Sequence, residues 1–319
     1  MARYFLQRRS PGMGSDNMLR VSCGGIDLAS PILVASGVWP FEKDFWLKER
    51  FPGLGGICTK AVTSHGREGN RGTRVWETPG GMLNSIGLQN RGVEHFLERD
   101  LPVISDGGIP FIVNVAMENP DETSEVLKKL EIMRDKIPAV ELNISCPNVS
   151  DGGMAWGKCA RSSAQAVSMA RKKWSGPLWV KLTPQAEDIG EVSRVAQDEG
   201  ADALVVGNTW LGMAIDTDKC SPVFERVFAG LSGPAIFPLA LRMVWEACSS
   251  VSIPVIGCGG VTSAKDCLAM LMAGATAVEI GTAMFLDLQS GKKLSSGLEE
   301  YLLARGLDGL NDIIGKARR

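Results

Sequence analysis

The sequence predicts a single eight-stranded parallel β/α barrel, and three observations predict this fold class. Eight short apolar runs rich in β-branched residues recur along the chain, and longer amphipathic segments separate them. Eight such units exceed the about five or six strands that a doubly wound open sheet typically uses. The length of 319 residues fits one barrel with insertions, although length alone would also fit two domains.

The predicted elements alternate between strand and helix, as in a TIM barrel. The strands are the runs 31–35, 54–59, 110–115, 139–144, 178–182, 203–206, 254–256 and 277–280. The helices are the segments 122–136, 163–174, 186–199, 236–249 and 263–273, several of them acidic early and basic late, as the helix dipole favours. We therefore assign residues 19–319 to one domain. Residues 1–18 form an extension without a clear pattern, for which we expect either disorder or packing against a neighbour.

Composition and charge exclude several classes of function. Lysine and arginine number 34 against 36 aspartate and glutamate, and this balance, with no basic stripe, argues against a nucleic-acid partner. The longest apolar stretches, 203–206 and 210–215, are far shorter than the roughly 20 residues of a membrane span. The first 17 residues lack the apolar core of a signal peptide. We therefore expect a cytoplasmic protein without a membrane partner.

Metal, disulfide and nucleotide-hydrolysis chemistry are not indicated. The eight cysteines include no C-x-x-C pair, and His65 and His95 are the only histidines, so we expect reduced thiols and no metal site. Residues 152–158 have the glycine and lysine spacing of a P-loop, but Cys159 stands where that motif needs Ser or Thr. The G-x-S-x-G motif of α/β-hydrolases is absent from the sequence.

The ends of the predicted strands carry the residues from which chemistry is expected, because a β/α barrel builds its active site at the C-terminal ends of its strands. These exits hold Ser36, Gly37, Lys60, Asn114, Ser145, Cys146, Lys181, Asn208, Thr209, Gly259, Gly260, Gly281 and Thr282. The glycines after the last two strands favour a phosphate held on backbone N–H groups. With two lysines able to neutralise an anion, this pattern suits a phosphorylated cofactor such as FMN, whose reduced ring carries negative charge.

The end of the fourth predicted strand and the loop after it, residues 141–148, form the densest polar cluster in the chain. It places the Cys146 thiol beside a hydroxyl and two carboxamides, and Asn84 and Asn208 add two more carboxamides from other loops. Uncharged donors and acceptors at this density suit a flat, polar heterocycle. A thiol with a pKa of about 8.5 can act as a general base where its site favours the thiolate. From the residues alone, a buried structural cysteine is an equally good interpretation.

These motifs resemble the class 1 dihydroorotate dehydrogenases, and the resemblance runs from about residue 19 to residue 307. Residues 143–148, Asn-Ile-Ser-Cys-Pro-Asn, are similar to the family's substrate loop, in which class 2 enzymes have Ser in place of Cys. Segments 208–216 and 230–236 are similar to the NAD-linked B type more than to the fumarate-linked A type. The resemblance implies a homodimer core, a heterotetramer with an electron-transfer subunit carrying FAD and a [2Fe–2S] cluster, and a place in de novo pyrimidine biosynthesis.

The resemblance also implies roles for individual residues. Orotate would be held by Lys60, Asn84, Ile86, Gly87, Leu88, Asn143, Asn148, Asn208 and Thr209. FMN would be held by Ala35, Ser36, Lys60, Asn114, Asn143, Lys181, Gly207, Gly233, Gly259, Gly260, Gly281 and Thr282. Cys146 and Lys60 would be catalytic. Cys146 would remove a proton from C5 of dihydroorotate while hydride passes from C6 to N5 of FMN.

Two positions depart from the family's pattern, and three other functions stay open. Met117 stands where the family usually has Gly, and Phe237 where B-type chains usually have Lys. A dihydropyrimidine dehydrogenase-type FMN barrel would act on uracil or thymine instead, although Asn148 argues against it. A Schiff-base lyase using Lys181 or Lys60 would need no flavin. A non-enzymatic subunit would keep the fold alone.

Overall fold

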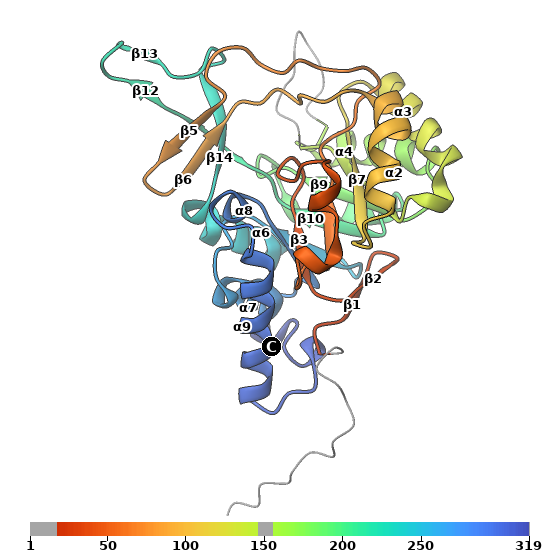
Figure 1. Ribbon diagram of the computed structural model, residues 1–319, viewed down its shortest axis with the longest axis vertical. Helices are drawn as coiled ribbons and strands as arrows, with labels where there is room; N and C mark the ends of the chain where they lie inside the picture. The colour runs from red at the N-terminus through yellow and green to blue at the C-terminus, as the bar shows by residue number, and fades with distance from the viewer. Residues whose placement is uncertain (1–17, 146–155, 319) are drawn as a thin grey trace, which may run out of the picture.

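The structure is a closed barrel of eight parallel strands, as the sequence predicts (Figure 1). The computed structural model describes residues 18–145 and 156–318. Around the barrel the strands follow the order β10-β15-β16-β3-β4-β7-β8-β9, so that chain neighbours pair and the last strand closes on the first. The strands are β3 (Ile32–Val34), β4 (Gly56–Cys58), β7 (Phe111–Ala116), β8 (Ala139–Asn143), β9 (Leu178–Leu182), β10 (Ala203–Val206), β15 (Val255–Cys258) and β16 (Ala277–Ile280). Each overlaps one of the eight predicted runs.

Helices cover the outside of the barrel, and their ends follow the capping residues. The α-helices are α1 (Val93–His95), α2 (Leu101–Ser105), α3 (Pro120–Ile132), α4 (Ala160–Arg171), α5 (Ile189–Asp198), α6 (Phe237–Cys248), α7 (Ala264–Met272), α8 (Thr282–Leu286) and α9 (Ser290–Ala304). The prediction starts the first long helix at residue 122, whereas α3 starts at Pro120 because the Asn119 side chain caps the first turn. Ser263 forms a capping box with Asp266 at α7.

Short irregular helices fill several connections. A π-helical turn (Phe96–Asp100) joins α1 to α2, so three short pieces make up the helical part of the connection between β4 and β7. The 3₁₀ turns span Lys43–Phe45, Lys48–Arg50, Arg134–Lys136, Pro234–Ile236, Leu310–Asp312 and Lys316–Arg318. No helix within residues 18–145 and 156–318 is long and apolar enough to cross a membrane.

Antiparallel strands that the sequence pattern did not predict lie outside the barrel. β5 (Val75–Thr78), β6 (Gly81–Asn84), β11 (Trp210–Met213) and β14 (Phe228–Ser232) form a four-stranded sheet in the order β11-β14-β6-β5. β12 (Ile215–Asp216) pairs with β13 (Ser221–Pro222), and β1 (Val21–Cys23) pairs with β2 (Ile26–Leu28). In Figure 1, β5, β6, β12 and β13 project at the upper left, away from α7 and α9. Segments 75–84 and 210–232 thus meet although they lie far apart in the sequence.

The β1–β2 hairpin packs against the N-terminal ends of two barrel strands. The Trp179 indole Nε1, which is buried, donates a hydrogen bond to the carbonyl oxygen of Gly24 at 2.9 Å. Gly24 has a φ of +49°, and a Cβ atom there would meet the Trp179 ring and come within 2.6 Å of Ala203 Cβ. Only glycine combines this backbone conformation with such a close approach.

We expect Gly24→Ala to lower the free energy of unfolding by about 2–4 kcal/mol, because it adds overpacking to the cost of a positive φ. Gly306→Ala is the matched control. Gly306 has a φ of +65° with nothing within 4 Å of an added Cβ, so only the backbone cost of about 1–2 kcal/mol applies there. Urea unfolding of both variants measures the difference. Equal destabilisation would show that the Trp179 contact tolerates the methyl group.

Candidate active site

A cavity of about 730 Å³ opens at the C-terminal ends of the barrel strands, and the antiparallel sheet forms one of its walls. Its size is within the range typical of small-molecule sites. Most of the predicted site residues line it together: Ala35, Ser36, Lys60, Asn84, Ile86, Gly87, Leu88, Asn143, Lys181, Asn208, Thr209, Gly233, Gly259, Gly260, Gly281 and Thr282. Segments from across the chain, residues 35 to 282, therefore meet at one site.

Lys60 follows β4 and lies in the cavity wall. Its side chain extends past Gly37, where an added Cβ would lie 3.4 Å from Lys60 Nζ. Burial, and then the positive charge of Arg74, lower the pKa of Lys60 below its ordinary value. Within the described chain Lys60 forms no ion pair, so its ammonium group is available to an anion in the cavity.

Hydrogen bonds to neighbouring hydroxyl and backbone groups orient the carboxamides of the site. Asn143 Oδ1 accepts from the Ser145 backbone N–H at 3.1 Å and from the Ser145 hydroxyl at 2.5 Å. Asn208 Nδ2 donates to the Ser145 hydroxyl, while Asn208 Oδ1 accepts from the Thr209 N–H at 2.7 Å. Asn84 Nδ2 donates to the carbonyl of Gly230 at 3.2 Å, which ties β6 to β14. These contacts fix which edges of the amides face the cavity.

The turn after β6 brings its backbone into the cavity wall. Gly87 has a φ of +74°, and an added Cβ would lie 2.6 Å from the Asn70 backbone nitrogen. That nitrogen donates to the carbonyl of Ile86 at 3.0 Å, and Leu88 has a φ of +54°. The positive φ angles and the close contact hold residues 86–88 as a fixed edge beside Asn84.

Glycines form the opposite rim of the cavity. Gly259 and Gly260 follow β15 with φ angles of +136° and +73°, and Gly281 precedes α8. In the part of the chain that the structure describes, their backbone N–H groups donate to no protein acceptor. An added Cβ on Gly260 would lie 2.5 Å from the Phe237 nitrogen, so glycine lets α6 approach this rim. Exposed N–H groups at such a rim are suited to an anion such as phosphate.

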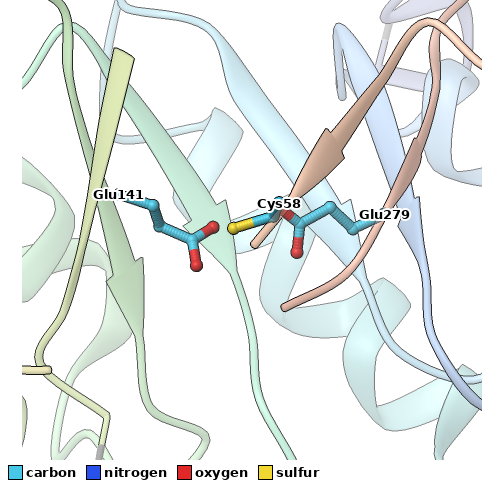
Figure 2. Close-up of side chains that lie close together, drawn as sticks. All are labelled: Cys58, Glu141 and Glu279. Atoms are coloured by element: carbon cyan, nitrogen blue, oxygen red, sulfur yellow. The ribbon is translucent and has the colours of Figure 1, made fainter. Parts of the chain in front are cut away.

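Lys181 lies in the floor of the cavity, and two buried carboxylates contact it from behind. Its Nζ lies 2.6 Å from Glu279 Oε2 and 3.7 Å from Glu141 Oε1, and all three side chains are at most 3% exposed. Figure 2 shows Glu141 and Glu279 pointing toward each other, with Cys58 between them. Asn114 donates to Glu141 Oε1 at 2.5 Å and does not line the cavity. The structure therefore places Asn114 behind the predicted cofactor site.

Four further residues from the sequence analysis are placed apart from the cavity or outside the described chain. Gly207 does not line the cavity, and its N–H donates to the Cys258 carbonyl at 3.0 Å. Met117 is buried, and its N–H donates to the Asn143 carbonyl at 3.0 Å. Cys146 and Asn148 lie outside the described residues.

Some lining residues were not singled out from the sequence. Arg226, just before β14, and Phe228, its first residue, reach the cavity, and the Ser232 hydroxyl lies 2.8 Å from the Thr282 hydroxyl. A strand signal in residues 228–232 would have found Phe228 and Ser232, but the glycine at 230 and the exposure of Phe228 obscure the alternation of apolar residues.

The chain matches the family model described as dihydroorotate dehydrogenase over residues 18–302. The dihydroorotate dehydrogenase B (NAD(+)) catalytic subunit of Phocaeicola vulgatus is 45% identical over 300 residues, which cover 93% of this chain and 98% of that protein. The corresponding subunit of a Thermoanaerobacter species is 44% identical over 94% of this chain and 99% of that protein. A crystal structure of DHODH from Eimeria tenella in complex with ferulenol has a TM-score of 0.78, covering 100% of this chain and 92% of that one. Its identity of 20% shows the shared fold alone.

The family match spans most of the chain, and relatives of 44–45% identity align over nearly their whole length. With the barrel and the cavity at its mouth, these matches establish that the chain belongs to the dihydroorotate dehydrogenase family of oxidoreductases.

Proposed function

We propose that this chain is the FMN-containing catalytic subunit that oxidises dihydroorotate to orotate in de novo pyrimidine biosynthesis, with Cys146 as the base. One observation carries the proposal most directly. A single cavity combines a lysine that forms no ion pair among the described residues, the three predicted carboxamides Asn84, Asn143 and Asn208, a glycine rim and a second lysine on its floor. The names of the B-type relatives, which describe NAD(+)-linked catalytic subunits, favour the same activity.

The lining offers the hydrogen-bond donors and the positive charge that FMN would need. The free N–H groups of Gly259, Gly260 and Gly281 would receive the phosphate, and Thr282 and Ser232 offer hydroxyls beside it. Lys181 would face the part of the ring where charge develops on reduction. When bound, FMN supplies the acceptor for the hydride that leaves C6 of dihydroorotate. Tight packing at Gly260 leaves this rim no room for a larger side chain.

The substrate would be held by groups that the structure has already oriented. Lys60 would bind the substrate carboxylate, because it is half-buried in the cavity wall and makes no ion pair in the described chain. Asn84, Asn143 and Asn208 would contact the heterocycle through amide edges fixed by their hydrogen bonds. Cys146 would take the C5 proton. A site of this kind discriminates strongly between similar heterocycles, because a ligand that lacks a matching polar group leaves the amides of the site without a hydrogen-bond partner.

Electrons would leave through a second subunit. The B-type names describe a catalytic subunit and NAD(+), and we propose a partner that carries FAD and a [2Fe–2S] cluster in a heterotetramer built on a homodimer of this chain. Exposed apolar side chains on the projecting sheet, including Trp76, Leu211 and Phe228, are compatible with a protein interface on that side.

Dihydroorotate should bleach the visible flavin absorption of the purified chain under anaerobic conditions, because hydride reaches the flavin from C6. Dihydrouracil and dihydrothymine test the dihydropyrimidine dehydrogenase-type alternative, in which they would give the hydride and bleach the flavin in place of dihydroorotate. A chain purified without flavin would contradict the proposed function.

Cys146→Ala should retain FMN but lose reduction by dihydroorotate by a factor of about 10²–10⁴, the usual contribution of a general base. Cys220→Ala, which removes an exposed thiol between β12 and β13, is the control and should bleach normally. Stopped-flow absorbance measures the rates of both. A Cys146→Ala variant that is reduced as fast as the unsubstituted chain would rule out Cys146 as the base.

The affinity for orotate should fall as the pH rises through the lowered pKa of Lys60. Above that pKa the amine is neutral and no longer attracts the carboxylate, so the Kd increases at a pH below the ordinary lysine range. Lys60→Arg keeps its charge throughout and should show a flat pH profile. Calorimetric titration at several pH values tests this. If the Kd of Lys60→Arg rises at alkaline pH in the same way, the pH dependence belongs to a group other than Lys60.

NAD(+) reduction should require the partner subunit. The purified chain is expected to pass electrons from dihydroorotate to an artificial dye but to reduce NAD(+) at a negligible rate. Co-expression with the candidate partner should restore NADH formation, measured by its absorbance. Full NAD(+) reduction by the isolated chain would contradict an electron path through FAD and the [2Fe–2S] cluster.

A further inference from the structure

Six polar side chains from six different strands meet inside the barrel, directly beneath the cavity. They are Cys58 (β4), Asn114 (β7), Glu141 (β8), Lys181 (β9), Cys258 (β15) and Glu279 (β16). Lys181 and Cys258 line the cavity, whereas Glu141 and Glu279 lie behind them and are fully buried. Figure 2 shows how close the two carboxyl groups come; one oxygen of each and the Cys58 sulfur lie within 4.8 Å of one another.

The charges in this cluster do not balance if both carboxyl groups are ionised. Lys181 is the one cation within contact distance, at 2.6 Å from Glu279 and 3.7 Å from Glu141 among the described residues. Two carboxylates and one ammonium group would leave a net charge of −1 among buried side chains, which is strongly unfavourable. Glu141 Oε2 and Glu279 Oε1 also have no hydrogen-bond partner in the described chain. A proton between the two carboxyl groups removes the excess negative charge and gives an unpaired oxygen a hydrogen-bond partner.

A metal ion explains the cluster less well than a proton does. Cys58, Glu141 and Glu279 could each offer a ligand atom, but the Lys181 ammonium group already contacts Glu279 at 2.6 Å. A divalent cation there would face this positive charge at close range. Carboxyl groups forced together at a buried site commonly share a proton instead.

The electrostatics agree with a carboxyl proton rather than with a titrating thiol. Burial, and then the charge of Glu141, raise the pKa of Glu279 to about 8, against the lowering effect of Lys181. Burial also raises the pKa of Cys23 and of Cys258 to about 12, and that of Cys58 well above its usual value. These are the titratable groups that face Glu279 from β1, β4, β8, β9 and β15. At neutral pH the thiols and Lys181 therefore keep their protons, and Glu279 is the group in this cluster whose pKa is moved close to neutral.

We propose that Glu141 and Glu279 share one proton at neutral pH. They act through Lys181 as positioning residues, so that the affinity of this carboxyl pair for its proton is coupled to the reduction of the flavin. The proposal rests on the proposed function, because it places FMN against Lys181. Hydride transfer into the cavity adds negative charge next to the Lys181 ammonium group. That charge strengthens the hold of the carboxyl pair on its proton, and by reciprocity the protonated pair makes reduction easier.

The proton and electron balance of this coupling is simple. Dihydroorotate gives a hydride to the flavin from C6 and a proton to Cys146 from C5. Where the carboxyl pair has lost its shared proton in the oxidised enzyme, reduction draws one further proton from solvent to the pair, and reoxidation by the electron acceptor releases it. No bond to the carboxyl oxygens forms or breaks other than this O–H bond.

Infrared spectroscopy of the carboxylic-acid C=O stretch tests the shared proton without requiring flavin or substrate. The unsubstituted chain should show a protonated-acid band at pH 6–7 that disappears as the pH rises through about 8, the value to which the pKa of Glu279 is raised. Glu279→Gln and Glu141→Gln should each abolish the band, because the remaining single carboxylate then pairs with Lys181. Glu246→Gln, which alters an exposed glutamate on α6, is the control and should keep it.

Reduction potentials measured against pH with a chemical reductant and mediator dyes test the coupling to the flavin. Near pH 6 the holoenzyme and Glu279→Gln should have similar potentials, because Gln resembles the protonated acid. Above about pH 8 the unsubstituted enzyme should have the lower potential and should take up more protons per two electrons than the variant. A merely structural effect of the substitution would shift the potential equally at every pH.

Distinct outcomes would overturn the proposal. The absence of a protonated-acid band in the unsubstituted chain at pH 6–7 would exclude a shared proton, and this measurement needs no variant to fold. A band that survives Glu141→Gln would assign the proton to burial of Glu279 alone. Parallel potential curves for the holoenzyme and Glu279→Gln would exclude the coupling. A chain without FMN would refute the proposed function, while the infrared result would still decide whether the proton is shared.

Discussion

The ion pair between Lys181 and Glu279 constrains the rest of this molecule. It joins β9 to β16 through the inside of the barrel, where side chains on alternate strands normally pack as apolar layers. A lysine that is 3% exposed needs a partner, because a solitary buried charge costs several kcal/mol. Glu279 supplies the partner, and Asn114 holds the second carboxylate, Glu141, in place. The cavity above therefore has a floor with fixed charges.

Backbone pairing holds the wall of the cavity in place, whereas charged side chains hold its floor. The β5, β6, β11 and β14 sheet grows out of barrel loops, and backbone pairing and glycine contacts hold it in place. Gly81 and Gly233 approach so closely that a Cβ on Gly233 would lie 2.6 Å from Gly81 Cα. This approach places Asn84 beside Gly230, and so brings a carboxamide over the barrel mouth. The sheet thereby adds cavity-facing groups that the barrel strands alone could not supply.

The sequence was sufficient for the barrel because its strands are buried on both faces and read as continuous β-branched runs, as in 178–182 and 203–206. The sequence did not predict the antiparallel sheet, because β5 is short and largely exposed and so has no buried face that a residue pattern would reveal. Most of the candidate site could be predicted from polar residues at the strand exits. The pairing of Lys181 with Glu141 and Glu279 could not, because register across non-neighbouring strands is absent from a local pattern. A lone Glu within an apolar strand, as at position 279, is the signal that points to it.

The two lysines of the cavity can have separate tasks because their partners differ. Lys181 has its charge offset by Glu279, so it can meet a developing negative charge without attracting every anion that enters. Lys60 has no carboxylate partner in the described chain, and burial favours its neutral form until an anion arrives. A carboxylate that binds Lys60 therefore regains the electrostatic energy that burial removed. Placing the unpaired lysine in the wall and the paired one in the floor would direct a substrate carboxylate to the former and leave the latter for the flavin.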